Sequence, residues 1–449
     1  MEHGPSDTFV ADPALVELPV GDVAAGGGCV GRAPDGRVAF VRYAAPGERV
    51  RARVTEERAH FLRADAVEIL DASSGRVVPA CPHAGPGRCG GCDWQHLDLA
   101  LQRRLKAQLV ATQLGRVAGI DRHLVVEELP GAPDGLGWRT RVRFAVAPDG
   151  RIGLRRHRSH GIEPAADCPL AVASLRAAAT VLPRWKGARE VEITALGADS
   201  VPLIAVSTLS GANRRPTTVP ALPVELAGAG LVVDGRSLAG PGHVVAEVRH
   251  RRFRVSYGSF WQVHVAAPLT LIDAVIAALE PREDERVVDL YAGVGLFAGF
   301  LAEAVGARGS VLAIEQDRRA ASDARANLAD LANVVVRSRR VDAALVAREL
   351  EGADLVVLDP PRQGAGVATM EALCALDAPP RRVAYVACDP ASFARDARVL
   401  LEAGWQLGTL RAFDLFPMTE HVELVAAFER PAPPGQRVHL PASHLPAYE

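Results

Sequence analysis

The chain has 449 residues, 49% of them hydrophobic, and a formal net charge of -2 at pH 7. The length predicts two or three domains, and the apolar content excludes a globally disordered chain. Because no run of 18 apolar residues occurs and the N-terminus shows no basic stretch followed by an apolar one, the sequence predicts neither a membrane span nor a secretory leader, and we expect a cytoplasmic protein without a membrane partner.

Residues 11–72 are predicted to form a small β-barrel. Alternating apolar stretches follow the turn signals Asp35-Gly36 and Pro46-Gly47, and another runs from Ala64 to Leu70. Short strands without intervening helices are typical of OB-like barrels, which often hold oligonucleotides. We therefore expect a nucleic-acid-binding barrel in this segment.

Residues 73–262 are expected to form a mixed α+β central domain. A helix is predicted over residues 97–117, where Leu101, Leu105 and Leu109 recur at helical spacing. We expect this helix to pack on the C-terminal domain, which would make the rest of the segment an insertion. The remaining residues indicate strands rich in Gly, Pro and Arg, and the pattern does not give their order.

The central segment also carries four cysteines that could share a metal site. Cys81, Cys89 and Cys92 are closely spaced, and Cys168 lies farther along the chain. Thiols at such spacings bind zinc or an iron–sulfur cluster, and spacing alone does not decide between them. Unligated core cysteines are the third alternative.

Residues 263–430 are predicted to form a doubly wound α/β domain of the Rossmann-like type. From about residue 281, apolar runs of strand length alternate with helical stretches, which indicates a parallel sheet covered by helices on both faces. The predicted strands are residues 287–290, 311–314, 334–336, 355–358 and 383–386. A final pair, near residues 407–413 and 422–428, is predicted to form a hairpin at one edge of the sheet. We expect the Pro-rich tail, residues 431–449, to be disordered.

A glycine-containing turn follows the first predicted strand of this domain. Gly293 and Gly295 stand where doubly wound folds bind nucleotides, but the next glycine is Gly299, so the dinucleotide pattern Gly-x-Gly-x-x-Gly is not met. Asp289, just before the turn, would repel a pyrophosphate and attract an ammonium group. The turn therefore favours S-adenosylmethionine over NAD as the bound nucleotide.

Two more acidic residues follow the next two strands. Glu315 ends the second strand, where a carboxylate can accept hydrogen bonds from both ribose hydroxyls. Asp342 follows the third strand and is placed to receive an adenine amino group. Both residues are candidates for binding the nucleoside of the cofactor.

Three chemically suited side chains end the later strands. Asp359 is followed by two prolines, which hold its carboxylate in place. Cys388 closes the fifth strand at the same edge of the sheet. Alone it would be interpreted as a packing residue, but its position near Asp359 and before a helix start favours a nucleophile. Glu423 lies within an apolar strand, where burial raises the pKa of a carboxyl and prepares it to accept and release a proton.

Taken in order, these motifs resemble those of the RNA 5-methyluridine methyltransferases. They are Phe-Trp-Gln at residues 260–262, Asp-Pro-Pro-Arg at 359–362, Cys-Asp-Pro at 388–390 and Phe-Pro-Met-Thr-Glu-His-Val-Glu at 416–423. The resemblance covers about residues 12–430, and its N-terminal barrel is similar to the TRAM domain. The sequence departs from the family pattern at four positions, which are His264, Leu296, Ala387 and Asp389.

The resemblance implies methylation of carbon 5 of a uridine in structured RNA, in ribosomal rather than transfer RNA. Carbon 5 of uracil is a poor nucleophile, so a thiolate must first add to carbon 6 and a base must later remove the carbon 5 proton. Cys388 is expected to be that nucleophile and Glu423 that base. The residues implied to line the cofactor and base pocket are Gln262, Tyr291, Glu315, Asp342 and Asp359.

The Cys-Gly-Gly-Cys sequence at residues 89–92 resembles the [4Fe-4S] site of the ribosomal-RNA branch of the family. We therefore favour a [4Fe-4S] cluster on the four cysteines over zinc. No obligate protein partner is implied, and a monomer is expected. Two other functions are weighed against this interpretation: methylation of an amino group of adenine or cytosine, and a non-catalytic RNA-binding or ribosome-assembly protein that retains the methyltransferase fold.

Overall fold

The computed structural model describes residues 14–197, 200–209 and 219–430. Its first part is a closed barrel with the strand order β1-β2-β3-β5-β4. The strands are β1 (Leu15–Val23), β2 (Cys29–Arg32), β3 (Val38–Arg42), β4 (Arg49–Glu57) and β5 (Phe61–Asp71). Alternate side chains of these strands fill the barrel, which is the small OB-like barrel predicted from the sequence. Residues 11–13 of the predicted barrel and the predicted tail, 431–449, lie outside the described residues.

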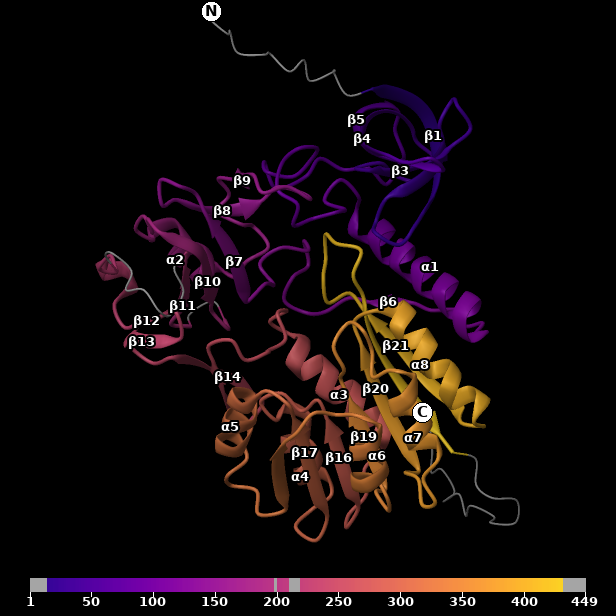
Figure 1. Cartoon of the computed structure of the whole chain (residues 1–449), viewed down its shortest axis with the longest axis vertical. Helices are drawn as coiled ribbons and strands as arrows, with labels where there is room; N and C mark the ends of the chain where they lie inside the picture. The colour runs from indigo at the N-terminus through magenta and orange to yellow at the C-terminus, as the bar shows by residue number, and fades with distance from the viewer. Residues whose placement is uncertain (1–13, 198–199, 210–218, 431–449) are drawn as a thin grey trace, which may run out of the picture.

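Helix α1 (Leu99–Ala118) connects the barrel with the C-terminal part of the molecule (Figure 1). The Asp98 carboxylate accepts a hydrogen bond from the Leu101 amide at its start, and Gly119 ends it with a φ of 65°. Val110 and Leu114 are buried in the same apolar cluster as Phe393 of helix α8 (Pro390–Glu402). The helix therefore packs on the C-terminal part, as predicted, against residues distant in sequence.

The central part is a seven-stranded mixed sheet with the order β13-β12-β11-β10-β7-β8-β9. Its elements are β7 (Arg141–Val146), β8 (Ile152–Arg155), β9 (Ile162–Glu163), α2 (Ala173–Val181), β10 (Ala188–Thr194), β11 (Leu203–Thr208), η1 (Val224–Leu226), β12 (Gly230–Val233) and β13 (Arg236–Ala239). Helix α2 covers one face of this sheet and shares its apolar core. The arrangement is the mixed α+β architecture predicted from the sequence.

A hairpin of β14 (His243–Val248) and β15 (Arg251–Ser256) follows and packs against the C-terminal part. The Asp323 carboxylate of helix α5 (Arg318–Asn327) accepts hydrogen bonds from the Ser256 amide and hydroxyl, each at 2.8 Å. The domain limits at residues 72 and 262 stay a prediction.

The C-terminal part is an eight-stranded sheet with the order β18-β17-β16-β19-β20-β22-β21-β6. Its strands are β6 (Val126–Glu127), β16 (Arg286–Leu290), β17 (Ser310–Glu315), β18 (Val334–Ser338), β19 (Leu355–Leu358), β20 (Arg382–Ala387), β21 (Gln406–Phe413) and β22 (Glu423–Glu429). The first five strands of the order run parallel, and β22 runs antiparallel to β20 and to β21. The predicted hairpin is present, but β6 lies outside it and forms the edge.

Helices cover both faces of this sheet. They are α3 (Ala267–Leu279), α4 (Leu296–Ala304), α5, α6 (Ala343–Glu349), α7 (Val367–Cys374) and α8. Val287 and Leu355 pack in one apolar cluster with α3 and α4, whereas Val288 and Val356 pack in another with α6, α7 and α8. This alternation along parallel strands confirms the predicted doubly wound fold.

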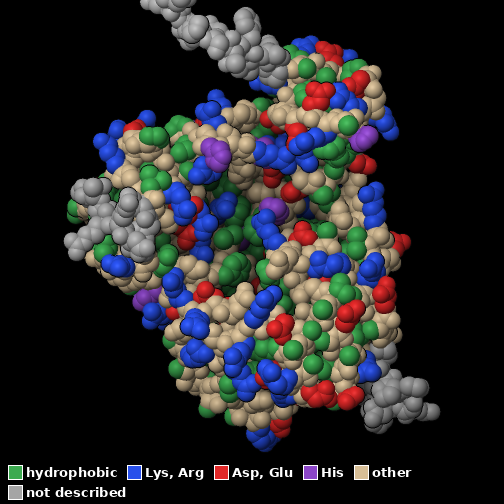
Figure 2. All heavy atoms as spheres, viewed as in Figure 1, with side chains coloured by type: hydrophobic (Ala, Val, Ile, Leu, Met, Phe, Trp, Pro, Cys, Tyr) green, Lys and Arg blue, Asp and Glu red, His purple; other side chains and the backbone are tan. Residues whose placement is uncertain are grey.

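Figure 2 shows a hollow between the barrel, the central sheet and the C-terminal sheet, with lysine and arginine side chains gathered around it. Five arginines of the central part line one cavity on this part of the molecule: Arg139, Arg143, Arg155, Arg156 and Arg158. Among the residues that the structure describes, no helix combines the length and apolarity needed to cross a membrane.

Candidate active site

The predicted nucleophile and the predicted base lie at the same end of two paired strands. The register of β20 and β22 pairs Ala387 with Leu424 as its last partners, so the next residues, Cys388 and Glu423, stand opposite each other. Directly opposed residues of antiparallel strands project from the same face of the sheet. Glu423 is also the partner of Phe413 in β21, and only 3% of it is exposed.

Burial and neighbouring carboxylates govern the protonation of this pair. Burial raises the pKa of the Cys388 thiol to about 12, helped by the charges of Glu423 and Asp359, while Arg362 opposes them. Burial also raises the pKa of Glu423 well above its usual range, again with Asp359 adding and Arg362 opposing. Cys388 stands two residues before the first residue of helix α8, whose start is expected to favour a thiolate, whereas burial and the two carboxylates act in the opposite direction.

Asp359 connects Cys388 and Glu423 to the Phe-Trp-Gln motif at residues 260–262. Its pKa is raised to about 7 by burial. The Gln262 side-chain amide donates to the Asp359 carboxylate at 3.4 Å, which brings the Phe-Trp-Gln and Asp-Pro-Pro-Arg motifs together. Four residues far apart in sequence therefore meet at the carboxyl end of the sheet, where doubly wound folds form their sites.

The glycine turn lies beside them, between β16 and α4. Tyr291, Gly293 and Gly295 have φ values of 65°, 56° and 91°, which is the left-handed region that favours glycine. A Cβ at Gly295 would come within 2.7 Å of the Leu328 side chain, whereas one at Gly293 would meet open space. The backbone of Gly293 is therefore free to approach a ligand.

Asp289 lies just before the turn and has an unsatisfied carboxylate oxygen. It is fully buried, and one carboxylate oxygen accepts from the Ala298 amide at 2.9 Å. Its other oxygen is buried without a hydrogen-bond partner in the structure. Burial raises the pKa of Asp289 well above its usual range, and the charges of Asp359 and Glu315 raise it further. The ammonium group of a ligand would donate a hydrogen bond to the unpartnered oxygen and would balance the negative charge of the carboxylate.

The other predicted cofactor residues surround the turn. The Glu315 carboxylate accepts from the Gly293 amide at 2.9 Å and from the Asp317 amide at 2.7 Å, so it fixes the turn. Asp342 is the N-cap of α6 and accepts from the Leu345 amide with one oxygen, which leaves the other oxygen exposed to a ligand. Burial raises the pKa of Tyr291 to about 12, with Asp342 among the charges that act on it.

The four candidate metal ligands also converge. Cys81, Cys89, Cys92 and Cys168 line one cavity of about 310 Å³. Burial raises the pKa of Cys89 to about 11 and that of Cys92 to about 12, and the nearby thiols raise both further. Within the described ranges, however, no three His, Cys, Asp or Glu side chains are close enough to share one metal ion.

The four departures from the family pattern all have a packing or capping role. Leu296 and Ala387 are buried in the apolar clusters on opposite faces of the sheet. Asp389 caps helix α8 by accepting from the Ser392 amide at 2.7 Å, a role that asparagine fills equally well. His264 is fully buried and stacks on Trp138 with ring centroids 5.6 Å apart.

Sequence reasoning missed several residues near the site. Arg362 is the cation that opposes the carboxylates at Cys388 and Glu423. Lys106 and Gln102 of α1 contact the loop that precedes Glu423. Lys106 had a signal that could have marked it, because it is one of only two lysines in the sequence, beside Lys186.

The chain matches two family models and several relatives. The TRAM domain matches residues 15–67, and the family described as Conserved hypothetical protein 95 matches residues 273–386. An uncharacterized RNA methyltransferase of Streptomyces avermitilis is 46% identical over 93% of this chain and 99% of its own length. The 23S rRNA (uracil(1939)-C(5))-methyltransferase RlmD of Vibrio parahaemolyticus is 32% identical over 87% of this chain and 91% of its own length.

Among solved structures, the tRNA (uracil-54, C5)-methyltransferase of Pyrococcus abyssi in complex with S-adenosyl-L-homocysteine shares the fold, with a TM-score of 0.68 at 24% identity. The alignment covers 92% of this chain and 99% of that one. The full-length relatives, the TRAM barrel and the doubly wound sheet agree with the motifs in the sequence. The chain therefore belongs to the family of S-adenosylmethionine-dependent RNA 5-methyluridine methyltransferases.

Proposed function

We propose that this protein methylates carbon 5 of a uridine in RNA, with Cys388 as the covalent nucleophile and Glu423 as the base. The observation that carries the proposal is the opposition of these two residues at the end of β20 and β22, next to Asp359 and the glycine turn. An enzyme that methylates an amino group needs neither a thiol nor a buried carboxyl at this place.

Cys388 begins the reaction. Its thiol loses its proton to solvent, and the resulting thiolate bonds to carbon 6 of the uracil while the electron pair of the carbon 5–carbon 6 double bond moves to carbon 5 and oxygen 4. Arg362 favours the thiolate because its charge lowers the pKa of Cys388. S-adenosylmethionine would supply an electrophilic methyl group to the activated carbon 5, with the electron pair of the broken sulfur–methyl bond staying on the departing S-adenosylhomocysteine.

Glu423 ends the reaction. Its carboxylate takes the proton from the methylated carbon 5, and the electrons of that C–H bond restore the double bond to carbon 6. The bond between carbon 6 and the Cys388 sulfur breaks, and its electron pair returns to the sulfur. Arg362 also lowers the pKa of Glu423, so the same cation favours the basic form of the carboxyl.

For the cofactor, we assign binding roles to the predicted residues around the turn. Asp289 would hold the ammonium group with its unpartnered oxygen. Glu315 would bind the ribose hydroxyls and Asp342 the adenine amino group. Gly293 and Gly295 form the turn, while Tyr291 and Gln262 line the pocket with Asp359.

As the substrate, we propose ribosomal RNA. Two of the relatives that align along most of their length are 23S rRNA methyltransferases at 32% and 33% identity. The barrel and the arginines around the hollow in Figure 2 would hold the phosphates of a structured RNA and present one uridine.

We further propose that Cys81, Cys89, Cys92 and Cys168 hold a [4Fe-4S] cluster. The donor set supports it, because four thiols converge on one cavity lined by arginines, which suit a negatively charged group. The cluster would stabilise the central part and take no chemical step. Protein purified without oxygen should contain iron and sulfide in equal amounts. Zinc in their place would overturn this assignment.

The test of the proposed function is direct detection of the product. Purified protein is incubated with S-adenosylmethionine labelled in its methyl group and with transcripts of 23S rRNA or tRNA, and the RNA is digested to nucleosides. The proposal predicts labelled 5-methyluridine from ribosomal RNA, and none with Cys388→Ala. Label in tRNA alone would contradict the choice of substrate. A different methylated nucleoside, or RNA binding without any methylation, would contradict the proposed chemistry.

A further inference from the structure

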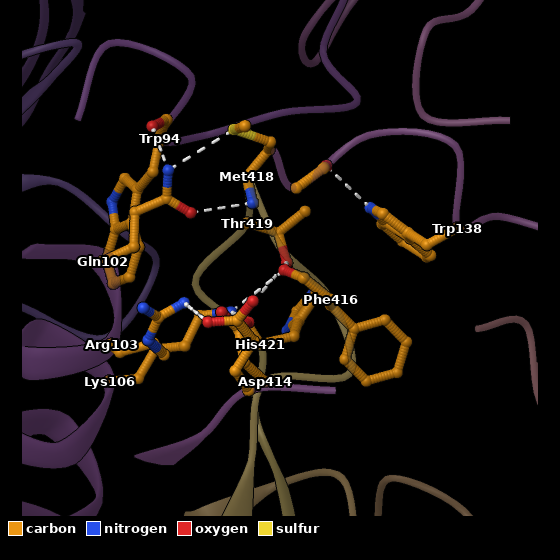
Figure 3. A network of polar contacts seen from close by, with 12 residues as sticks. Trp94, Gln102, Arg103, Lys106, Trp138, Asp414, Phe416, Met418, Thr419 and His421 are labelled. Carbon is orange, nitrogen blue, oxygen red and sulfur yellow. Dashed lines mark hydrogen bonds and ion pairs between the residues drawn. The ribbon is translucent and has the colours of Figure 1, made fainter. Parts of the chain in front are cut away.

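The loop that leads into Glu423 is held by residues outside the C-terminal sheet. It runs from Asp414 to Val422 and joins β21 to β22. Figure 3 shows Lys106 and Gln102 of α1 pointing toward this loop from one side and Trp138 of the central part lying near Phe416. The position of the predicted base therefore depends on segments about 300 residues away.

Lys106 holds the beginning of the loop. Its ammonium group is fully buried and donates to the Asp414 carboxylate at 2.5 Å and to the Phe416 carbonyl at 3.0 Å. Asp414 follows Phe413, which is the strand partner of Glu423. The ion pair of Lys106 and Asp414 is therefore one residue along the chain from Phe413, the strand partner of Glu423.

Gln102, one turn before Lys106 on the same helix, holds the middle of the loop. Its side-chain oxygen accepts from the Met418 amide at 2.8 Å, and its nitrogen donates to the carbonyls of Trp94 and Leu97 at 3.0 and 2.8 Å. The Met418 carbonyl in turn accepts from the Asp93 and Trp94 amides, each at 3.0 Å. Met418 has a φ of 70°, a conformation that a residue other than glycine keeps only when its surroundings impose it.

The desolvation of the buried ion pair between Lys106 and Asp414 is unfavourable, which argues that the pair has a role other than stabilising the fold. A buried ion pair contributes little net stability compared with apolar side chains of the same size, because both charges lose their hydration. What it does provide is a fixed geometry, since the ammonium group must keep both partners. One oxygen of Asp414 is buried without a partner, a further sign that packing alone did not select this pair.

We propose that Lys106 and Asp414 are positioning residues, which hold the 414–422 loop so that the Glu423 carboxyl reaches the carbon 5 proton. This inference rests on the proposed function and concerns only its last step. Cys388 is held by β20 and α8, so its attack on carbon 6 does not depend on the ion pair. Loss of the pair should slow proton removal and leave formation of the covalent adduct unchanged.

The experiment compares the two steps in one set of variants. The main variant is Lys106→Met with Asp414→Asn, in which both charges are removed together so that neither is left buried alone. The matched control is Arg103→Met on the same helix, which removes the partly exposed ion pair with Glu128 and leaves the hydrogen-bonded pair of Lys106 and Asp414 in place. Glu423→Gln is the reference for a missing base. Each protein is given the cofactor and either ordinary or 5-fluorouridine RNA, and denaturant-stable protein–RNA adduct and 5-methyluridine are followed.

We expect the double variant to form the 5-fluorouridine adduct within about twofold of the wild-type rate, because that adduct requires no carbon 5 proton. On ordinary RNA it should release product about 10- to 100-fold more slowly and accumulate adduct as Glu423→Gln does, since small displacements of a reacting group have effects of this size. Arg103→Met should behave as wild type.

An equal loss of both steps, or an unchanged rate of product release, would overturn the positioning role. Failure of the wild-type protein to form the 5-fluorouridine adduct would instead overturn the proposed function and this inference with it.

Discussion

Cys388 and Glu423 stand opposite each other where β20 and β22 end, and the charge of Glu423 opposes ionisation of the Cys388 thiol. Glu423 is the first charge that raises the pKa of the Cys388 thiol, which burial takes to about 12. Burial favours the neutral thiol and the neutral carboxyl. Arg362 is the cation of the site that favours both ionised forms.

Glu423→Gln should separate the two halves of the reaction. Glutamine keeps the size of the side chain but cannot take a proton, so the methylated adduct with Cys388 should form and persist. Product release should fall by a factor of about 10²–10⁴, the usual contribution of a positioned base. The measurement is the amount of denaturant-stable complex with ordinary RNA. Rapid release of 5-methyluridine by this variant would show that another group is the base.

The reactivity of Cys388 in the free protein should depend on Glu423. Because the pKa of the thiol is about 12, iodoacetamide should alkylate Cys388 slowly at pH 8. Where Glu423 is ionised, its charge opposes the thiolate, so Glu423→Gln should speed alkylation several-fold at a pH high enough to ionise the wild-type carboxyl. Peptide mapping by mass spectrometry follows residue 388 separately, with Cys374 as the internal control. An unchanged rate would mean that Glu423 does not act on the thiol.

Asp289→Asn should change cofactor binding and stability in opposite directions. Asparagine cannot form an ion pair with an ammonium group, so the affinity for S-adenosylmethionine should fall by about 1.5–3 kcal/mol. The free protein should gain about 1–2 kcal/mol, because a buried carboxyl with an unpartnered oxygen disappears. Calorimetry with the cofactor and urea unfolding without it measure the two effects. Unchanged affinity would place the ammonium group elsewhere.

We expect Glu420 to make the stability of the protein depend on pH. Its carboxylate accepts from the Gly26 amide of the barrel at 2.6 Å, and burial, with Asp93 adding, raises its pKa from 4.5 to about 7. The folded state therefore binds the proton more tightly than the unfolded state, so stability is full below about pH 4.5 and declines as the pH rises to about 7.

Glu420→Gln should remove this decline, which amounts to at most about 3 kcal/mol. The urea midpoints of variant and wild type should therefore differ more at pH 8 than at pH 5, with the variant more stable. A difference that does not vary with pH would contradict the assignment to Glu420.

The sequence predicted the parts of the site that lie at strand ends. Asp289, Glu315, Asp359 and Cys388 each close or follow an apolar run, and parallel strands bring their carboxyl ends to one edge whatever the rest of the chain does. The helix over residues 97–117 was predicted almost to its ends, because its apolar spacing is a local signal.

Long-range partners could not be predicted in the same way. Lys106 and Asp414 are 308 residues apart, and no local pattern connects them. The order of the central strands could not be predicted from the sequence either, because β11 and β12 pair in parallel across a long connection. β6 has only two residues, too few for any periodicity, and yet it forms the edge of the large sheet. The direction in which the pKa of the Cys388 thiol shifts could not be predicted either. It depends on the charges of Glu423 and Asp359, and only the folded structure brings these residues close to Cys388.

The covalent role of Cys388 is tested most directly with RNA in which 5-fluorouridine replaces uridine. Fluorine at carbon 5 cannot leave as a proton, so the adduct formed after methyl transfer cannot resolve. Mass spectrometry of the digested complex should find the methylated nucleotide attached to the peptide that contains residue 388, and Cys388→Ala should give no complex. Methyl transfer to ordinary RNA that persists in Cys388→Ala, or an adduct on another cysteine, would contradict the account.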